Sequence, residues 1–567
     1  MNDVQAAGWN RLARIAGTGL LFALLLFACG CARAEWKLTA SCPSRGGEAV
    51  YSWTTAGVTT LCVPGFWDLS AVTLEAEGQE KIYLGPDRLE ITAGETADLS
   101  GLTDQRLTVL DSRREPAGHV TIMQGSEICA LFLEVDREGL KLVNRSRENK
   151  LETGRIVFYE PDGQVSYDGE LTQLKGRGNI TFNFSKKPYQ FKLKEKASLA
   201  GMEKAKTWVL LANWTDRTLL RNQIVLDISR EVGLRYAVGC AQTDVWINGT
   251  YNGLYLLTEK IQVGKNRVNI TDLEEETEKV NADSFDPGEL EKNKREGFIL
   301  FRSYPAVQDP EDITGGYIAV IEKNFRMQQN DFPGVRTDRQ LNIYIKEPTY
   351  PSTAQVEYLG QRMTELQHAL LAADGICPET GKHYTDYLDV ESFALKYLIE
   401  DWCKNYDYLA GSQYFYKDSD LIDPKIYAGP AWDYDLSFGN MNDRGVLTTA
   451  GYLNNNKQDN NIYWLLYSHK EFRELVAKRW CSVFRPAAGI LLGETPPQEG
   501  SALRSFEDYR EGVRASAAMN FRKWGKNHAT SKESGEFFST AVPYLENWIR
   551  IHTAAMDEMY GYQAKTE

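Results

Sequence analysis

The spacing of apolar side chains changes along this chain, and the change restricts the folds that it can adopt. Before about residue 270, apolar residues occur in short strand-like runs such as 49–55, 128–135 and 189–194. Later, apolar residues recur every three or four positions, which predicts helices over residues 355–373, 389–405, 471–484, 505–524 and 541–560. The chain is therefore predicted to be an α+β protein with a β-rich front and a helical back.

Three local patterns in the front part predict particular elements. Side chains alternate over residues 189–194, so Lys192 should point away from the apolar face of a strand. Apolar residues recur at four-residue intervals over 220–232, which predicts an amphipathic helix. Asn248 and Gly249 separate two β runs and tolerate positive φ, so they predict a hairpin. Residues 274–312 are charged and lack steady periodicity, and we expect a solvated insertion there.

The N-terminus has the pattern of an export signal. Arg11 and Arg14 precede an apolar run at 19–29 that is too short to span a bilayer comfortably. Two processing sites compete. Residues 26–29 resemble a bacterial lipoprotein box that ends at Cys29, whereas residues 32–34 fit a cleavage site after Ala34. We prefer the lipid anchor, and we expect membrane attachment only at this end because no later stretch is apolar enough for a transmembrane helix.

The net charge and the cysteine spacing limit which partners and metal sites are expected. The chain has 64 Lys and Arg against 78 Asp and Glu, a net charge of −14, and no basic block, so nucleic acid is not an expected partner. Seven cysteines follow the signal without C-x-x-C spacing, which argues against a zinc site. Cys42 and Cys62 could close a disulfide in an oxidising compartment, and the odd total leaves at least one thiol free.

Acidic residues stand in apolar surroundings at two places. Asp433 and Asp435 lie one residue apart between Trp432 and Phe438. Buried carboxylates need a partner for their charge, and a metal ion would be one. A simple turn, a calcium loop and the acid-x-acid site of a glycosyltransferase remain alternatives. Asp407 follows a predicted helix, where a rigid scaffold could present it for chemistry or where it could merely cap a turn.

Several blocks together resemble the CotH family of spore-coat and secreted proteins, over about residues 120–560. The blocks are GRGN, KKPYQFKLKEKASLAGMEKAKTWVLLANWTDRTLLRNQIVLDISREVGL, VWINGTYNGLYLLTEKI, KEP, DVESFALKYLIEDWCKNYD and WDYDLSFGN. The resemblance implies an atypical protein-kinase-like fold with a β-rich N-lobe and a helical C-lobe. It also implies ATP and Mg²⁺ or Mn²⁺ as cofactors, and Ser or Thr of protein substrates as acceptors.

The resemblance assigns nucleotide-binding roles to residues in the β-rich part. It makes Lys192 the partner of the ATP phosphates, although strand lysines are commonly only solvated. The turn that contains Arg177, Gly178 and Asn179 becomes a candidate cover for the phosphates. Glu259 would lie near the connection between the lobes and touch the nucleotide.

The same resemblance assigns the acids. Asp407 would orient the acceptor hydroxyl or accept its proton, and Asp435 would bind the metal with Asp433 beside it, so Asp407 and Asp435 are the expected catalytic residues. No H-R-D triplet precedes Asp407. Ser412 stands where an ordinary kinase has a metal-binding Asn, so no ligand for a second magnesium is assigned.

These features lead to two hypotheses of function. The preferred one is a secreted or surface-anchored CotH-like protein kinase, because the set of a lysine and three acids is intact. The alternative is a non-catalytic cell-envelope binding or assembly module on the same fold, which export and Ser412 favour. The expected organisation is an export signal at 1–34, a β-rich accessory domain at 35–119, an N-lobe at 120–270, an insertion and the C-lobe with its active-site loops at 271–470, and the helical end of the C-lobe at 471–567.

Overall fold

The computed structural model describes residues 37–44, 48–55, 57–282, 287–409, 411–451, 458–525, 534–535 and 537–563. The expected export signal, with Cys29 and Ala34, lies outside these residues. The chain divides into two compact units, one comprising residues up to 63 and 67–123, the other residues 64–66 and 124–567. Within the described segments, no helix is both long enough and apolar enough to cross a membrane.

The first unit is built from short strands. One sheet has the order β3-β4-β10-β9-β6-β7, and β2, β1, β5 and β8 pair in that order. The strands are β1 (Leu38–Ser41), β2 (Val50–Tyr51), β3 (Trp53–Thr55), β4 (Val58–Val63), β5 (Val72–Ala76), β6 (Lys81–Leu84), β7 (Leu89–Thr92), β8 (Thr96–Ala97), β9 (Arg106–Leu110) and β10 (Pro116–Gln124). Cys42 and Cys62 are both buried, and the possible disulfide between them is not formed.

The second unit begins with a sheet that closes on itself. Its order is β16-β15-β14-β13-β11-β17-β18, and β18 pairs back with β16. Only the pairing of β11 with β17 is parallel. The elements are β11 (Cys129–Glu134), α2 (Arg137–Val143), β12 (Lys150–Leu151), β13 (Arg155–Tyr159), β14 (Val165–Gly176), β15 (Tyr189–Ala197), β16 (Ala205–Leu211), β17 (Cys240–Ile247) and β18 (Thr250–Glu259).

Two local predictions for this sheet are confirmed. Tyr189, Phe191 and Leu193 are buried on β15, whereas Lys192 is exposed. Asn248 and Gly249 both have positive φ (49° and 75°) and join β17 to β18 as a hairpin. The alternation of side chains along a strand and the φ freedom of these turn residues are local properties, which is why the sequence could predict them.

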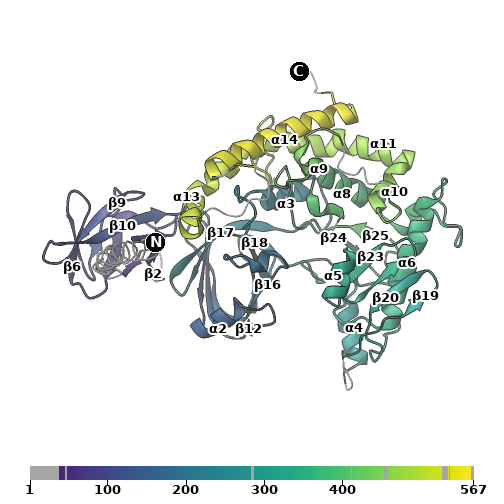
Figure 1. Cartoon of the computed structure of the whole chain (residues 1–567), viewed down its shortest axis with the longest axis horizontal. Helices are drawn as coiled ribbons and strands as arrows, with labels where there is room; N and C mark the ends of the chain where they lie inside the picture. Colours follow the sequence, from purple (N-terminus) through teal and green to yellow (C-terminus); the bar gives the residue numbers. More distant parts are fainter. Residues whose placement is uncertain are drawn as a thin grey trace, which may run out of the picture. The chain divides into compact units, whose positions relative to one another are not determined.

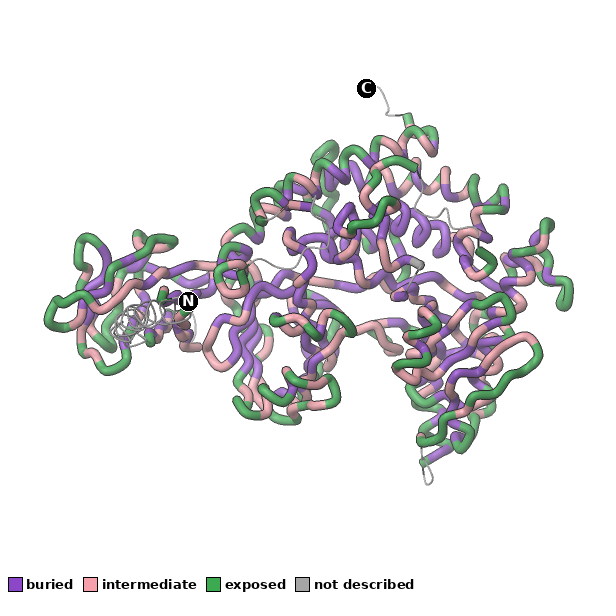
Figure 2. The backbone as a smooth tube through the Cα atoms, viewed as in Figure 1, coloured by how far each residue is buried: buried purple, intermediate pink, exposed green. Residues whose placement is uncertain are grey.

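The predicted helix over 220–232 exists as α3 (Arg221–Glu231), but it is not amphipathic. Nine of its residues are buried, polar ones included. The sequence pattern does not predict that the polar face of α3 is buried, because that burial depends on polar partners from a distant helix, α13 (Phe506–Trp524). For example, the Tyr509 hydroxyl on α13 donates to Asp227 on α3 (2.8 Å). Figure 2 shows buried chain along both α3 and α8.

A second sheet of the same unit has the order β19-β20-β22-β23-β21-β24-β25. Residues 298–302 form β20 within it, and Leu300 and Phe301 are buried, so the prediction of a fully solvated insertion over 274–312 is wrong for this part. The elements are α4 (Leu273–Val280), β19 (Lys294–Arg295), β20 (Phe298–Arg302), β21 (Tyr317–Ile321), α5 (Asn324–Gln329), β22 (Gly334–Thr337), β23 (Asn342–Glu347), β24 (Gln413–Lys417) and β25 (Ile426–Ala428).

Helices complete this unit (Figure 1), and the five predicted helical stretches are confirmed. The stretch over 471–484 is interrupted by a π-helical turn at Trp480–Phe484. The helices α8 and α11 pack together, and α13 packs on β18. They are α6 (Thr353–Leu371), α7 (Tyr384–Tyr387), α8 (Val390–Cys403), α9 (Arg444–Leu447), α10 (Ile462–Ser468), α11 (Lys470–Arg479), α12 (Arg485–Leu491), α13 and α14 (Phe538–Tyr560).

Candidate functional site

Asp407 is positioned by the end of α8. Lys404 takes a left-handed conformation (φ 43°) that ends the helix, and a 3-10 turn, Tyr406–Leu409, follows. The Asn405 Oδ1 atom accepts a hydrogen bond from the Asp407 N–H (3.2 Å), and Asn405 Nδ2 donates to the Asp433 carbonyl oxygen (3.3 Å). Asn405 therefore connects the turn that carries Asp407 to the loop that carries Asp433.

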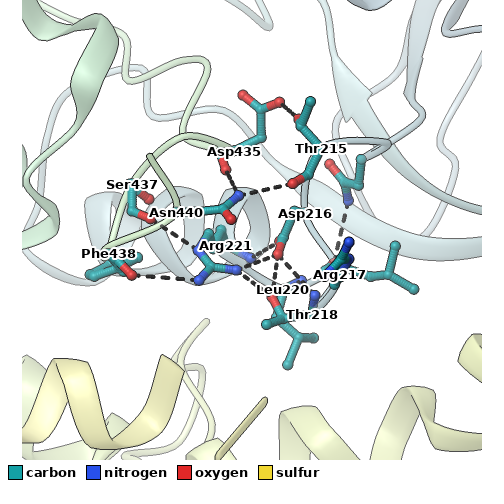
Figure 3. A network of polar contacts seen from close by, with 12 residues as sticks. Thr215, Asp216, Arg217, Thr218, Leu220, Arg221, Asp435, Ser437, Phe438 and Asn440 are labelled. Carbon is teal, nitrogen blue, oxygen red and sulfur yellow. Dashed lines mark hydrogen bonds and ion pairs between the residues drawn. The ribbon is translucent and has the colours of Figure 1, made fainter. Parts of the chain in front are cut away.

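The loop with Asp433 and Asp435 is fixed by side chains from distant segments. Ser412 Oγ donates to Asp433 Oδ2 (3.0 Å). The Thr215 hydroxyl donates to the Asp435 carboxylate, and Asn440 Nδ2 donates to the Asp435 carbonyl (2.7 Å) and the Thr215 carbonyl (2.9 Å) (Figure 3). Ser412 thus supports Asp433.

The residue between the two aspartates anchors the loop in the core. Tyr434 is fully buried, and its hydroxyl donates to Glu400 Oε1 on α8 (2.8 Å). Glu400 also forms a buried ion pair with Lys396. The Tyr434 N–H donates to Asn222 Oδ1 on α3 (2.7 Å). Because Tyr434 is fixed in the core, the aspartates on either side of it are held in place, with Asp435 buried and Asp433 partly exposed.

The three aspartates act on one another electrostatically. Burial raises the pKa of Asp407 to about 7, and repulsion from Asp433 adds to this effect. Burial raises the pKa of Asp435 to about 8, with further repulsion from Asp433 and Asp407, although the Thr215 hydrogen bond opposes the shift. The structure thus brings together Asp407, Asp433 and Asp435, which are predicted site residues from two separate stretches. Perturbed acids of this kind are typical of functional sites.

The raised pKa of Asp435 predicts a pH-dependent stability without divalent metal. An acid whose pKa rises from 3.8 to about 8 on folding stabilises the fold fully below about pH 4, and this stabilisation is lost as the pH rises through 8. The free energy of unfolding of the wild type should therefore fall between pH 5 and 8 relative to Asp435→Asn, by at most about 1.4 kcal/mol per pH unit. Urea denaturation at each pH measures this difference, and parallel profiles for the two proteins would contradict the prediction.

Oxygen ligands for a divalent cation are present in the site. Carboxylates suit Mg²⁺, which proteins commonly bind through one or two acids together with substrate phosphates. Asp433 and Asp435 fit this ligand set, because both carboxylates accept a hydroxyl hydrogen bond and Asp435 is buried beside like charge. Within the described part of the chain, no group of three or more His, Cys, Asp or Glu is arranged to hold a metal ion.

A cation from another sheet interacts with Asp433, and a second cation lies near the first. The Arg177 guanidinium lies 5.0 Å from the centre of the Trp432 ring, and Asp433 is among the groups that act on its pKa, which burial lowers. Its Nη1 atom is buried without a hydrogen-bond partner in the described structure. Burial lowers the pKa of Lys346 at the end of β23 to about 8, and the positive charge of Arg177 contributes. Arg177 and Lys346 are thus a partly exposed pair of neighbouring cations, of which Arg177 is the one that interacts with Asp433.

The other predicted nucleotide-binding residues lie elsewhere. Lys192 is exposed on β15, and within the described residues no hydrogen bond or ion pair joins it to the three aspartates. Gly178 takes positive φ (83°), and Arg147 Nη1 donates to its carbonyl oxygen and to Asn179 Oδ1, both at 2.8 Å. Glu259 at the end of β18 accepts from Arg267 Nη1 (2.7 Å) and from the Gly239 N–H (2.9 Å).

Sequence reasoning missed a buried ion pair beneath the site. Arg221 and Asp216 are both 0% exposed and pair with each other. Arg221 also donates to the Ser437 carbonyl (3.0 Å) and the Phe438 carbonyl (3.5 Å), so it fixes the end of the aspartate loop (Figure 3). The sequence did contain a signal for this pair, because Asp216 and Arg221 stand at the start of an apolar helical stretch. A charged side chain that is buried there needs a partner of opposite charge.

Lys346 was also missed as a site residue, although the KEP block was part of the resemblance. Lys346 lies on β23 in one sheet, whereas Arg177 follows β14 in another. Besides burial, the Arg177 charge lowers the pKa of Lys346 and the Glu322 charge opposes this effect, so the tertiary structure brings these groups near one another although they are far apart in the sequence. Strand order is set by tertiary structure, so sequence spacing gave no signal for this neighbourhood.

Comparison with known proteins adds one finding. The sequence model of a family described as "CotH kinase protein" matches residues 174–556. The match begins in β14, ends in α14 and includes every aspartate and cation described above, whereas the first unit of the chain lies outside it. No curated protein matches the chain.

Proposed function

Because the chain belongs to the CotH family, we propose that it is a phosphotransferase that moves the γ-phosphate of ATP to Ser or Thr hydroxyls of proteins. We also propose that the closed sheet of residues 129–259 and the helical part of the second unit correspond to the N-lobe and C-lobe of an atypical kinase. The observation that carries the proposal is the meeting of three mutually repelling aspartates, of which Asp435 is buried, with Arg177, which in turn neighbours Lys346.

Each of these residues has a role in phosphoryl transfer. The acceptor hydroxyl oxygen bonds to the γ-phosphorus while the bond from that phosphorus to the leaving ADP oxygen breaks. Asp407, with a pKa near 7, accepts the hydroxyl proton. Asp433 and Asp435 would hold the divalent cation, which neutralises phosphate charge when bound. Arg177 and Lys346 supply fixed positive charge for the same phosphates.

Arg177 and Lys346, rather than Lys192, should determine ATP affinity. Replacing either by Met removes a cation from the phosphates, and we expect the Kd for Mg²⁺-ATP to rise about tenfold or more. Lys192→Met is the matched control and should leave Kd within about twofold, because this side chain is exposed. Isothermal titration calorimetry measures all three. A large loss with Lys192→Met alone would instead support the role first expected from the family resemblance.

The activity itself is tested by incubating the protein with labelled ATP and Mg²⁺ or Mn²⁺ and following label transfer to protein. We expect transfer, and we expect the melting temperature to rise with nucleotide plus metal. If the wild type transfers no phosphate and its melting temperature does not respond to nucleotide plus metal, the kinase proposal is wrong. The non-catalytic binding module would then be the better account of the fold.

A further inference from the structure

A pocket of about 430 Å³ opens next to the aspartate cluster. It is bounded by the end of β21, the start of α5, the turn before β23 and residues 458–461. Side-chain amides line much of it, among them Asn324, Gln340 and Asn342. No role has been assigned to this pocket by the phosphoryl-transfer chemistry described above.

One guanidinium orients three of these amides. Arg336 Nε donates to Asn342 Oδ1 (3.1 Å), Arg336 Nη1 donates to Gln340 Oε1 (3.2 Å), and Arg336 Nη2 donates to Asn324 Oδ1. A guanidinium can only donate, so each amide must turn its oxygen toward Arg336. The three NH₂ groups have no hydrogen-bond acceptor within the described residues, so they are available as donors to a ligand.

The charges around the pocket favour an anion. The Lys323 ammonium makes no ion pair within the described chain. Glu322 is already satisfied, because its Oε1 atom accepts from Arg326 Nη1 and from the Lys323 N–H, both at 3.0 Å. Arg336 adds positive charge next to these pocket-lining amides, and its hydrogen bonds to their oxygens polarise their N–H groups. A carboxylate would satisfy these donors better than a neutral or cationic group.

The pocket adjoins Asp407. After Asp433, the charged groups that act most strongly on this carboxylate are Arg326, Lys323 and Glu322. The segment after Asp407 also packs against the same groups, since a Cβ atom on Gly411 would lie 2.8 Å from both Arg326 Nη1 and Glu322 Oε1. A ligand in the pocket would therefore extend toward the group that accepts the hydroxyl proton.

We propose that the pocket lined by Lys323 and the Arg336-bound amides binds an acidic segment of the protein substrate next to the phosphorylated Ser or Thr. That the bound segment belongs to a substrate rests on the proposed kinase function. The binding of an acidic peptide in this pocket does not require catalysis. A carboxylate side chain of the segment lies against Lys323 and the amide NH₂ groups, and the acceptor hydroxyl lies toward Asp407.

The test uses the full chain and fluorescein-labelled Ser peptides whose flanking residues are Glu, Gln or Lys. Fluorescence anisotropy should show the Glu peptide binding at least about fivefold more tightly than the other two. Lys323→Met and Arg336→Met should each remove most of this preference. Arg339→Met is the matched control, because Arg339 is half exposed and pairs only weakly with Asp338 (3.7 Å) and Asp459 (4.0 Å).

Three outcomes would overturn the proposal. One is equal affinity for the three peptides, the second is unchanged preference in Lys323→Met, and the third is displacement of the Glu peptide by ATP, which would make the pocket part of the nucleotide site. The melting temperature of each variant separates loss of binding from loss of folding. If nucleotide binding fails but the Glu preference depends on Lys323, then the kinase function is wrong and the acidic-peptide site stands.

Discussion

Replacing Asp407 by Asn is expected to reduce the rate of phosphate transfer by about 10²- to 10⁴-fold without lowering stability. The amide cannot accept the hydroxyl proton, although it has the shape of the carboxyl group. The folded state already disfavours the charged form of Asp407, because burial and the Asp433 charge raise its pKa to about 7. Removal of this charge should therefore leave the melting temperature unchanged or slightly higher at pH 8.

The measurement pairs a labelled-ATP transfer assay with thermal unfolding of the same samples. Asp374→Asn is the matched control, because Asp374 is exposed on the loop after α6, and it should change neither quantity. The opposite pattern, in which Asp407→Asn keeps full activity, would show that Asp407 only supports its turn. Loss of activity together with a lower melting temperature would likewise indicate a structural role.

The largest stability effect is expected at the ion pair of Arg221 and Asp216. Arg221→Met leaves the Asp216 carboxylate buried with hydrogen bonds from Thr218 and the residue 221 N–H but without a counter-charge. It also releases the Ser437 and Phe438 carbonyls that hold the aspartate loop. Breaking a fully buried pair by removing one partner costs about 3–5 kcal/mol, so the free energy of unfolding should fall by that amount.

A double-mutant cycle with Asp216→Asn separates charge from packing. The double variant should be more stable than the sum of the single losses predicts, because it no longer contains an unpaired buried charge. Arg514→Met is the control, because it removes a surface ion pair in which Arg514 is 61% exposed and Glu511 is 43% exposed. This variant should change the unfolding free energy by less than about 1 kcal/mol. Urea denaturation measures each variant, and an additive cycle would mean that the pair contributes no coupling.

The binding of Mg²⁺-ATP to Arg221→Met gives a second readout. The loop that carries Asp433 and Asp435 loses its hydrogen bonds to Arg221 on α3 and keeps the one to Asn222, so nucleotide affinity should decrease even at temperatures where the variant is folded. The Asp407→Asn variant should bind Mg²⁺-ATP nearly as well as the wild type, because Asp407 is assigned to the acceptor hydroxyl. The two variants therefore separate nucleotide binding from proton transfer.

The sequence by itself predicted the properties that depend on neighbours along the chain. Alternation over 189–194 placed Lys192 on the solvent side of β15, and Asn248-Gly249 specified the hairpin. The periodic apolar residues gave α6, α8, α13 and α14 to within a few residues. The ordered blocks gave the family, which the match over residues 174–556 confirms.

Only the tertiary structure decided which charges meet. Lys192 and Arg177 were both predicted for the phosphates, but only Arg177 interacts with Asp433 in the structure, and its charge also acts on Lys346, which was not predicted. Likewise, α3 has the periodicity of a half-exposed helix, but its first nine residues are buried, and Arg221 among them pairs with the buried Asp216. Periodicity specifies which face of an element is apolar, but the order of strands and the packing of helices determine what each polar face meets, and those long-range contacts are not encoded in local spacing.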